Sequence, residues 1–179
     1  MSSETRGYSL YLLDLDSTLT ESISGKTFPQ TVDDRKWMTG RLDRLRELQS
    51  QGKKTCIVTN QGGAAWGFLD PSDMHKFLGI LCEHGKIDHY LVCFHDTGEK
   101  AHASERTNKA LTVPDLTADG LERRKPGPGM LVEAMRYFSI PCSDTIMIGD
   151  REEDREAAKN ALTSFRWAWD FFGESPVIV

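Results

Sequence analysis

The chain has 179 residues, which fits one domain better than two, and a net charge of −5. A domain of this length buries roughly 70% of the surface that its unfolded chain exposes, so it can build a core. Hydrophobic residues make up 39% and charged residues 27%, the balance of an ordinary soluble globular protein. The acidic charge argues against a long nucleic-acid groove. No stretch approaches the ~20 apolar residues of a membrane span.

The four cysteines are spread widely and form no Cys-x-x-Cys pair; they are Cys56, Cys82, Cys93 and Cys142. We interpret them as reduced thiols of a cytosolic protein. The N-terminal segment MSSETRGYSL contains no long apolar run, so it does not resemble a signal peptide. We therefore expect a cytoplasmic protein that does not engage a membrane.

In the first half of the chain, apolar runs alternate with helical patterns. Residues 8–13 form an apolar run that predicts a buried strand, and the polar residues 20–33 predict a loop or small flap. Apolar residues at helical spacing predict a helix over 35–51. A second buried strand is predicted at 55–59, followed by a helix at 71–84 that has a proline in its first turn.

The second half of the chain continues the same alternation. Strands are predicted at 89–94, 145–148 and 164–168, and helices at 128–138 and 151–162. Residues between 95 and 124 are mostly polar and give no clear pattern. Strands that alternate with helices favour right-handed crossovers and a mainly parallel sheet. The sequence therefore predicts a single α/β domain over residues 1–179.

Polar residues follow the first two predicted strands, at the edge where parallel α/β sheets bind ligands. Asp14 and Asp16 follow the first strand, and Mg²⁺ would relieve the repulsion between these carboxylates. A carboxylate is also able to attack phosphorus and form an aspartyl-phosphate. Thr59 ends the second predicted strand and Asn60 begins the turn Asn60-Gln61-Gly62-Gly63, where hydroxyl and N–H groups would cradle phosphate oxygens. Taken singly, each set also fits a plain capping turn or glycine-rich turn.

Two further sets of polar residues lie in the second half of the chain. Lys125 precedes a predicted helix start, where the helix dipole favours an anion and an ammonium group would neutralise phosphoryl charge. Asp150 follows the predicted strand at 145–148 and is a candidate metal ligand. Singly, these sets also fit a solvated basic loop and an acidic helix N-terminus. All four sets together, in this chain order, favour a phosphate site.

The segments DLDST, TNQGG, RKPGPGM and GDREED together resemble the four motifs of haloacid dehalogenase (HAD) superfamily phosphatases. The resemblance runs from about Leu10 to Phe172 and implies a Rossmann-like three-layer sandwich. The gap between Thr18 and Thr59 is too short for a large cap domain. TNQGG followed by RKPGPGM is most similar to the branch, subfamily III, that contains histidinol-phosphate phosphatases, heptose-bisphosphate phosphatases and polynucleotide 3′-phosphatases.

The resemblance implies a role for each matching residue. Asp14 would be the nucleophile of an Mg²⁺-dependent phosphomonoester hydrolase, and Asp16 its general acid and base. Thr59 and the backbone of Asn60 would bind the phosphoryl group, and Lys125 would hold that group against the nucleophile. Arg124, which precedes the lysine, is a further candidate for binding substrate.

The resemblance also implies metal ligands. Mg²⁺ would be bound by Asp14, the backbone carbonyl of Asp16, and Asp150, whereas Asp154 would either reach the metal shell through water or fix the loop. Several relatives carry a zinc loop whose first half, Cys-x-His, resembles residues 93–95. Its second half is absent at residues 121–124, and His102 would supply only a third ligand where tetrahedral zinc prefers four. We therefore expect a polar strand end there.

Three functions remain open on the sequence alone. The first is hydrolysis of a small phosphorylated metabolite. The second is a polynucleotide 3′-phosphatase acting on nucleic-acid ends, which a local patch of Arg106, Lys109, Arg123 and Arg124 would serve. The third is a non-catalytic phosphate-binding module, although that function predicts a broken motif and every motif residue is present. Trp66 is expected either to line the mouth of the site or to pack under the glycine-rich loop, and the oligomeric state stays open.

Overall fold

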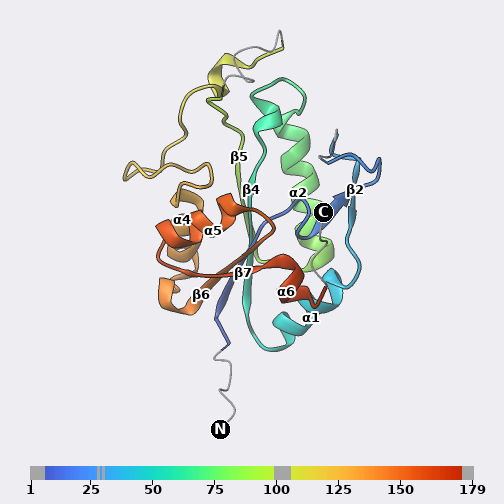
Figure 1. The fold of residues 1–179 in the computed structure, drawn as a ribbon, viewed down its shortest axis with the longest axis vertical. Coiled ribbons are helices and arrows are strands. Elements are labelled where there is room, and N and C mark those ends of the chain that lie inside the picture. The colour runs from blue at the N-terminus through green and yellow to red at the C-terminus, as the bar shows by residue number, and fades with distance from the viewer. Residues whose placement is uncertain (1–6, 28, 30, 99–105, 175–179) are drawn as a thin grey trace.

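The computed structural model describes residues 7–27, 29, 31–98 and 106–174, and its centre is a parallel β-sheet (Figure 1). The sheet has five strands in the order β5-β4-β1-β6-β7, and every neighbouring pair is parallel. The strands are β1 (Leu10–Leu13), β4 (Lys54–Asn60), β5 (His89–Cys93), β6 (Thr145–Gly149) and β7 (Ser164–Trp167). This topology confirms the predicted mainly parallel α/β fold.

Helices cover both faces of the sheet, which makes three layers. In the described part of the chain the helices are α1 (Arg41–Ser50), α2 (Pro71–Gly85), α4 (Gly129–Phe138), α5 (Glu152–Asn160) and α6 (Ala168–Phe172). The apolar side chains of α1, α2 and α6 form one core cluster with the sheet, and those of α4 and α5 form a second cluster. In Figure 1 these two groups of helices lie on opposite sides of the strands.

The central strand β1 shows why the sheet is buried on both faces. Successive side chains of a strand point to opposite faces. Tyr11 and Leu13 accordingly join the cluster with α1 and α2, whereas Leu10 and Leu12 join the cluster with α4 and α5. Its uninterrupted apolar run is therefore the pattern of a strand covered on both faces.

The prediction of one helix over residues 35–51 is wrong at its start. Residues 35–37 form β3 (Arg35–Trp37), which pairs antiparallel with β2 (Thr20–Ser22) in a small two-stranded sheet. Helix α1 begins only after Gly40, whose φ of 78° a helix does not contain. The polar contacts that the Arg35 side chain makes near β1 outweigh the helical spacing of the apolar residues. Of the predicted loop or flap at 20–33, residues 20–22 thus form β2, and the described residues after them lie between β2 and β3.

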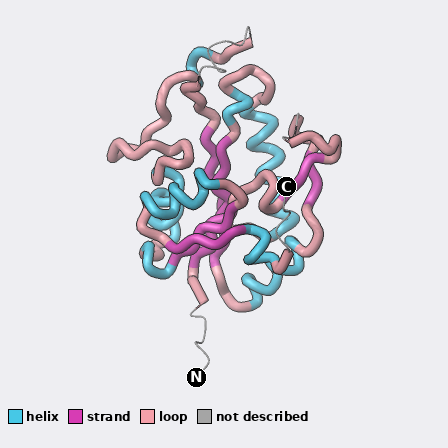
Figure 2. Tube along the Cα trace, viewed as in Figure 1, coloured by secondary structure: helices cyan, strands magenta, loops and turns pink. Residues whose placement is uncertain are grey.

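The remaining boundaries agree with the sequence to within a few residues, and among the described residues no large cap covers the sheet. Short 3-10 turns lie at Gly62–Ala64, Lys109–Leu111 and Cys142–Asp144. Between β5 and α4 the described chain is mostly loop, and it extends past the carboxyl ends of β4 and β5 (Figure 2). In the described part of the chain, no helix is long and apolar enough to cross a membrane.

Candidate active site

The predicted site residues meet at the carboxyl edge of the sheet. Asp14 directly follows β1, Thr59 and Asn60 end β4, and Asp150 directly follows β6. Because β1 lies between β4 and β6, these three strand ends are neighbours. Lys125 reaches the same edge from the loop that precedes α4.

Lys125 joins two buried carboxylates at the centre of the site. Its Nζ donates to Asp14 Oδ1 at 2.7 Å and to Asp154 Oδ1 at 2.6 Å, and its side chain is only 3% exposed. Burial raises the pKa of Asp14 well above its usual value; the Lys125 ammonium opposes this rise, and the nearby carboxylates of Asp154 and Asp150 add to it. Burial would lower the pKa of Lys125, but its two carboxylate partners outweigh burial and raise that pKa. The cluster therefore gathers three carboxyl groups, those of Asp14, Asp150 and Asp154, around the Lys125 ammonium group.

Asp14, Asp150 and Asp154 could hold a metal ion, because each offers a carboxylate oxygen within 4.8 Å of the others. Oxygen donors suit a hard cation such as Mg²⁺. Burial, and then the Asp154 carboxylate, raise the pKa of Asp150, so a cation there would compensate charge that the protein leaves unbalanced. The donor set thus fits the metal that the sequence predicts.

Asp154 has a structural task that distinguishes it from the other two carboxylates. One of its oxygens accepts from Lys125, and the other accepts the backbone N–H of Arg151 at 3.1 Å. It also packs so closely on Gly149 that a Cβ at that position would lie 2.3 Å from Asp154 Oδ2. Of the two predicted roles for Asp154, this geometry favours fixing the loop and the lysine.

Asp16 is held by residues whose role the sequence did not reveal. Its carboxylate accepts from Arg35 Nε at 2.9 Å and from Gln61 Nε2 at 2.9 Å. Gln61 also donates to Thr59 Oγ1 at 2.9 Å and accepts from Arg35, so one network links the predicted acid–base residue with the predicted phosphate-binding hydroxyl. Gln61 lies within the TNQGG motif. Arg35 belongs to the predicted helix over 35–51, and no sequence motif marks it as a site residue.

Asn60 fixes the backbone of the lysine loop. Its side-chain Nδ2 donates to the carbonyl of Lys125 at 2.9 Å, and its Oδ1 accepts the N–H of the same residue at 3.0 Å. This pair of hydrogen bonds positions the backbone of Lys125. The Asn60 side chain is therefore occupied, and the sequence predicts that the Asn60 backbone binds the phosphoryl group.

A pocket of about 430 Å³ opens above these residues. Its lining includes the predicted residues Asp14, Asp16, Thr59, Asn60, Arg124, Lys125 and Asp154, together with Arg35, Gln61, Trp66 and Phe68. Asp150 contacts the cluster but is not part of the lining. Trp66 is half-buried and lines the pocket, which agrees with the first of its two predicted positions. Arg124 donates to the carbonyl of His95 at 3.0 Å and pairs with Asp96 at 3.3 Å.

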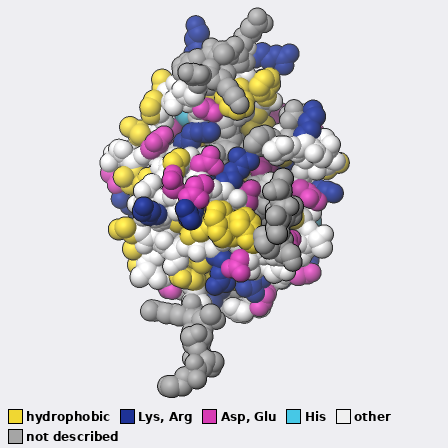
Figure 3. All heavy atoms as spheres, viewed as in Figure 1, with side chains coloured by type: hydrophobic (Ala, Val, Ile, Leu, Met, Phe, Trp, Pro, Cys, Tyr) yellow, Lys and Arg dark blue, Asp and Glu magenta, His cyan; other side chains and the backbone are white. Residues whose placement is uncertain are grey.

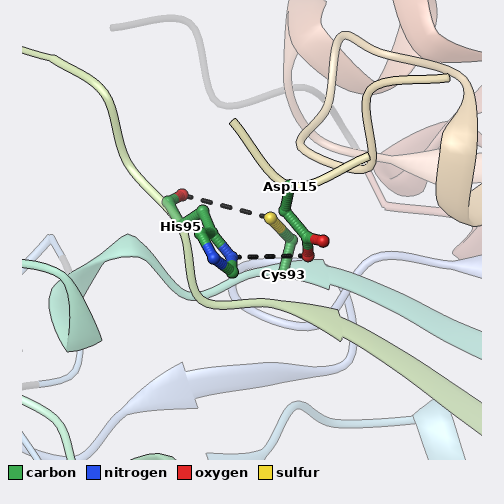
Figure 4. Close-up of side chains that lie close together, drawn as sticks. All are labelled: Cys93, His95 and Asp115. Carbon is green, nitrogen blue, oxygen red and sulfur yellow. Dashed lines mark hydrogen bonds and ion pairs between the residues drawn. The ribbon is translucent and has the colours of Figure 1, made fainter. Parts of the chain in front are cut away.

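The Cys-x-His segment lies outside this pocket and has a third polar neighbour (Figure 4). Cys93, His95 and Asp115 offer donor atoms within 4.8 Å of one another, and His95 Nδ1 lies 3.4 Å from Asp115 Oδ2. Arg123 also pairs with Asp115, at 3.4 Å, and so competes with any cation there. Asp115 gave no sequence signal, and His102 lies outside the described residues.

Comparison with known proteins places the chain in a family. Residues 9–167 match a family model described as polynucleotide kinase 3 phosphatase. The D-glycero-beta-D-manno-heptose-1,7-bisphosphate 7-phosphatase of Photorhabdus laumondii is 30% identical over 166 residues, which cover 86% of this chain and 76% of that protein. The enzyme of the same name from Rhodopseudomonas palustris is 30% identical over 138 residues, covering 74% and 69%.

Solved structures share the fold. The heptose bisphosphate phosphatase of B. bronchiseptica, crystallised with magnesium and phosphate, has a TM-score of 0.66 at 21% identity, and the match covers 88% of this chain and 78% of that one. A HAD-like phosphatase from Mesorhizobium loti has a TM-score of 0.67 at 25% identity, covering 87% and 68%. With all four motifs at one sheet edge, the chain belongs to the polynucleotide kinase 3 phosphatase family and is a HAD-superfamily phosphatase.

Proposed function

We propose that the chain is an Mg²⁺-dependent phosphomonoesterase that transfers the phosphoryl group to Asp14 and acts on a small phosphorylated metabolite. The observation that carries this proposal is the buried Asp14–Lys125 contact of 2.7 Å at the carboxyl end of β1, beside the carboxylate cluster. A nucleophilic carboxylate and a phosphate dianion repel each other. Catalysis of phosphoryl transfer therefore depends on positioning and on neutralising that charge.

The proposed reaction has two steps. In the first, an Asp14 oxygen attacks phosphorus, the bond to the leaving oxygen breaks, and Asp16 gives a proton to that oxygen. In the second, Asp16 takes a proton from water as the water oxygen attacks the same phosphorus, which releases phosphate and restores the Asp14 carboxylate. Lys125 contacts Asp14 throughout and offsets charge on the phosphoryl oxygens.

Asp14 and Asp150 would hold Mg²⁺, together with the backbone carbonyl of Asp16. The bound ion supplies positive charge that a phosphate dianion needs beside a carboxylate. Arg35 and Gln61 hold the Asp16 side chain toward the pocket, and the Gln61 contact to Thr59 ties it to the phosphate end. The chain's own residues therefore orient both the nucleophile and the proton donor.

Phosphate release from a substrate panel tests this proposal. The panel contains p-nitrophenyl phosphate, sugar phosphates including heptose bisphosphate, histidinol phosphate, nucleotides and a 3′-phosphorylated oligonucleotide, each with Mg²⁺ and with chelator. Turnover that requires Mg²⁺, disappears in Asp14→Asn and survives in Asp43→Asn is the expected result, because Asp43 is 83% exposed on α1. Full activity in Asp14→Asn would overturn the nucleophile assignment.

A second candidate function is a polynucleotide 3′-phosphatase, and the description of the matching family model favours it. The net charge of −5 argues the other way, and acidic and basic side chains are interspersed on the face in Figure 3. Contacts to several phosphates would make binding fall steeply with added salt. This second function would be established if a 3′-phosphorylated oligonucleotide were the best substrate and its binding weakened steeply with added salt.

A further inference from the structure

The pocket above Asp14 has an aromatic wall that the two reaction steps leave unexplained. Trp66 and Phe68 both line the pocket, with ring centroids 6.4 Å apart and ring planes at 90°. Phe68 is 59% exposed, although a large aromatic side chain usually loses contact with water on folding. An exposed aromatic face at the rim of a charged site is suited to a ligand with an apolar surface.

The loop that carries the wall is held in one shape. Gly67 has a φ of 74°, and a Cβ at this position would lie 2.1 Å from the carbonyl oxygen of Arg106, so only glycine fits. The N–H of Phe68 donates to the carbonyl of Gly63 at 2.9 Å. Asp70 then caps α2 by accepting two backbone N–H groups. The wall is therefore in place before a substrate arrives, which lowers the entropic cost of binding.

The basic residues around the pocket are already paired with carboxylates. The pairs are Arg35 with Asp16, Arg124 with Asp96, Lys125 with Asp14 and Asp154, and Arg151 with Asp150. A second phosphate on the substrate would have to compete with those carboxylates for each cation. Away from the reacting phosphate, the pocket is therefore better matched to an apolar ring than to another anion.

We propose that the wall of Trp66 and Phe68 selects phosphomonoesters whose leaving group carries a planar ring, with a nucleobase as the typical case. This inference rests on the proposed phosphatase function and names the substrate class of that site. With the phosphate held at Asp14 and Lys125, the leaving group extends along the pocket, where a ring stacks on an aromatic side chain. Such stacking accepts every base, because each has a π-face.

A matched substrate pair isolates the ring. Adenosine 5′-monophosphate and ribose 5-phosphate share the phosphate and the sugar and differ in the base. We expect kcat/KM to be about tenfold or more higher for the nucleotide, which is the scale of one base stacked on an aromatic side chain. Adenosine 3′-monophosphate and a 3′-phosphorylated oligonucleotide, tested alongside, distinguish a free nucleotide from a nucleic-acid end. Equal kcat/KM for the members of the matched pair would overturn the inference.

Variants of the exposed ring test its role without disturbing the core. Phe68→Ala is expected to lower kcat/KM for the nucleotide about tenfold and to leave ribose 5-phosphate unchanged. Phe68→Tyr keeps the ring and should keep the preference. Tyr137→Ala removes a similarly exposed ring (63%), which stacks on His89 at the start of β5, away from the strand ends that carry the site. This control should leave kcat/KM unchanged for both substrates. An equal loss for both substrates in Phe68→Ala would refute a stacking role.

Binding separates this inference from the proposed chemistry. Calorimetry on Asp14→Asn with Mg²⁺ compares the nucleotide with ribose 5-phosphate without turnover. The nucleotide should bind more tightly than ribose 5-phosphate, and Asp14→Asn/Phe68→Ala should lose this difference. That result would support ring binding by the wall even if hydrolysis depends on another residue. Equal affinity for the two ligands contradicts the wall, whereas Mg²⁺-dependent hydrolysis of both by the native chain would still support the phosphatase.

Discussion

Replacing Lys125 by methionine removes an ammonium group that contacts both Asp14 and Asp154. Methionine has a similar length and no charge, so the variant keeps most of the packing. The side chains of Lys125 and Asp154 are 3% and 2% exposed, and that of Asp14 is 10% exposed. The variant therefore leaves two carboxylates buried without their cation.

Removing one partner of a buried ion pair destabilises a protein by about 3–5 kcal/mol. We expect a loss of that size for Lys125→Met in chelator at pH 7, against a total stability of roughly 5–15 kcal/mol for a typical domain. The control is Lys36→Met. Lys36 pairs with Glu21 at 3.3 Å, but the two side chains are 56% and 47% exposed. Its loss should cost at most about 1 kcal/mol.

The pH dependence gives this prediction a second test. Loss of the ammonium raises the pKa of Asp14 further above its unfolded value, so the folded variant binds more protons than the unfolded chain between the two pKa values. The stability of the variant therefore falls as pH rises through that window, and its deficit relative to the native chain shrinks toward pH 4. Urea unfolding in chelator at several pH values measures both effects. A deficit that equals that of Lys36→Met, or that does not change with pH, would refute the reasoning.

Three further predictions follow from the same site and from the core. Asp16→Asn should lower turnover of alkyl phosphates by about a hundredfold or more, and that of p-nitrophenyl phosphate much less, because nitrophenolate leaves without a proton; equal losses in steady-state assays would contradict an acid role. Asp150→Asn should raise the Mg²⁺ concentration for half-maximal activity at least about tenfold in a metal titration, and an unchanged value would remove it from the ligands. Burial raises the pKa of Cys82 to about 12, so its thiol should react with Ellman's reagent at pH 8 far more slowly than free cysteine until the protein is unfolded.

The sequence was sufficient for the sheet and for most of the site, because both depend on local patterns. Apolar runs such as residues 10–13 are buried on both faces, and the polar sets at Asp14, Thr59 and Asp150 stand at or near the ends of such runs. Parallel strands bring the ends that carry Asp14, Thr59 and Asp150 to one edge. The contact between Asp14 and Lys125 was implied only by the family resemblance, because Lys125 lies in the loop before α4. These two residues are 111 positions apart in the sequence.

The contacts that the sequence did not predict depend on tertiary packing. Arg35 sits in a segment whose apolar spacing is helical, but its guanidinium is held by Asp16 and Gln61, and the segment forms a strand. Asp115 comes beside Cys93 only through the path of a long loop, which no local pattern encodes. In both cases the neighbouring residues come from segments that are separated in the sequence.

We propose that Asp14 carries the phosphoryl group between the two steps of the reaction. Rapid acid quench of the Mg²⁺-loaded enzyme during turnover, followed by mass spectrometry of its peptides, tests this claim most directly. We expect one added phosphoryl group on the peptide that contains Asp14. Hydroxylamine should remove it, as it removes an acyl phosphate, and it should be absent from Asp14→Asn. A native enzyme that turns over substrate with no phosphoryl group on that peptide, or with one on a different residue, would contradict the account.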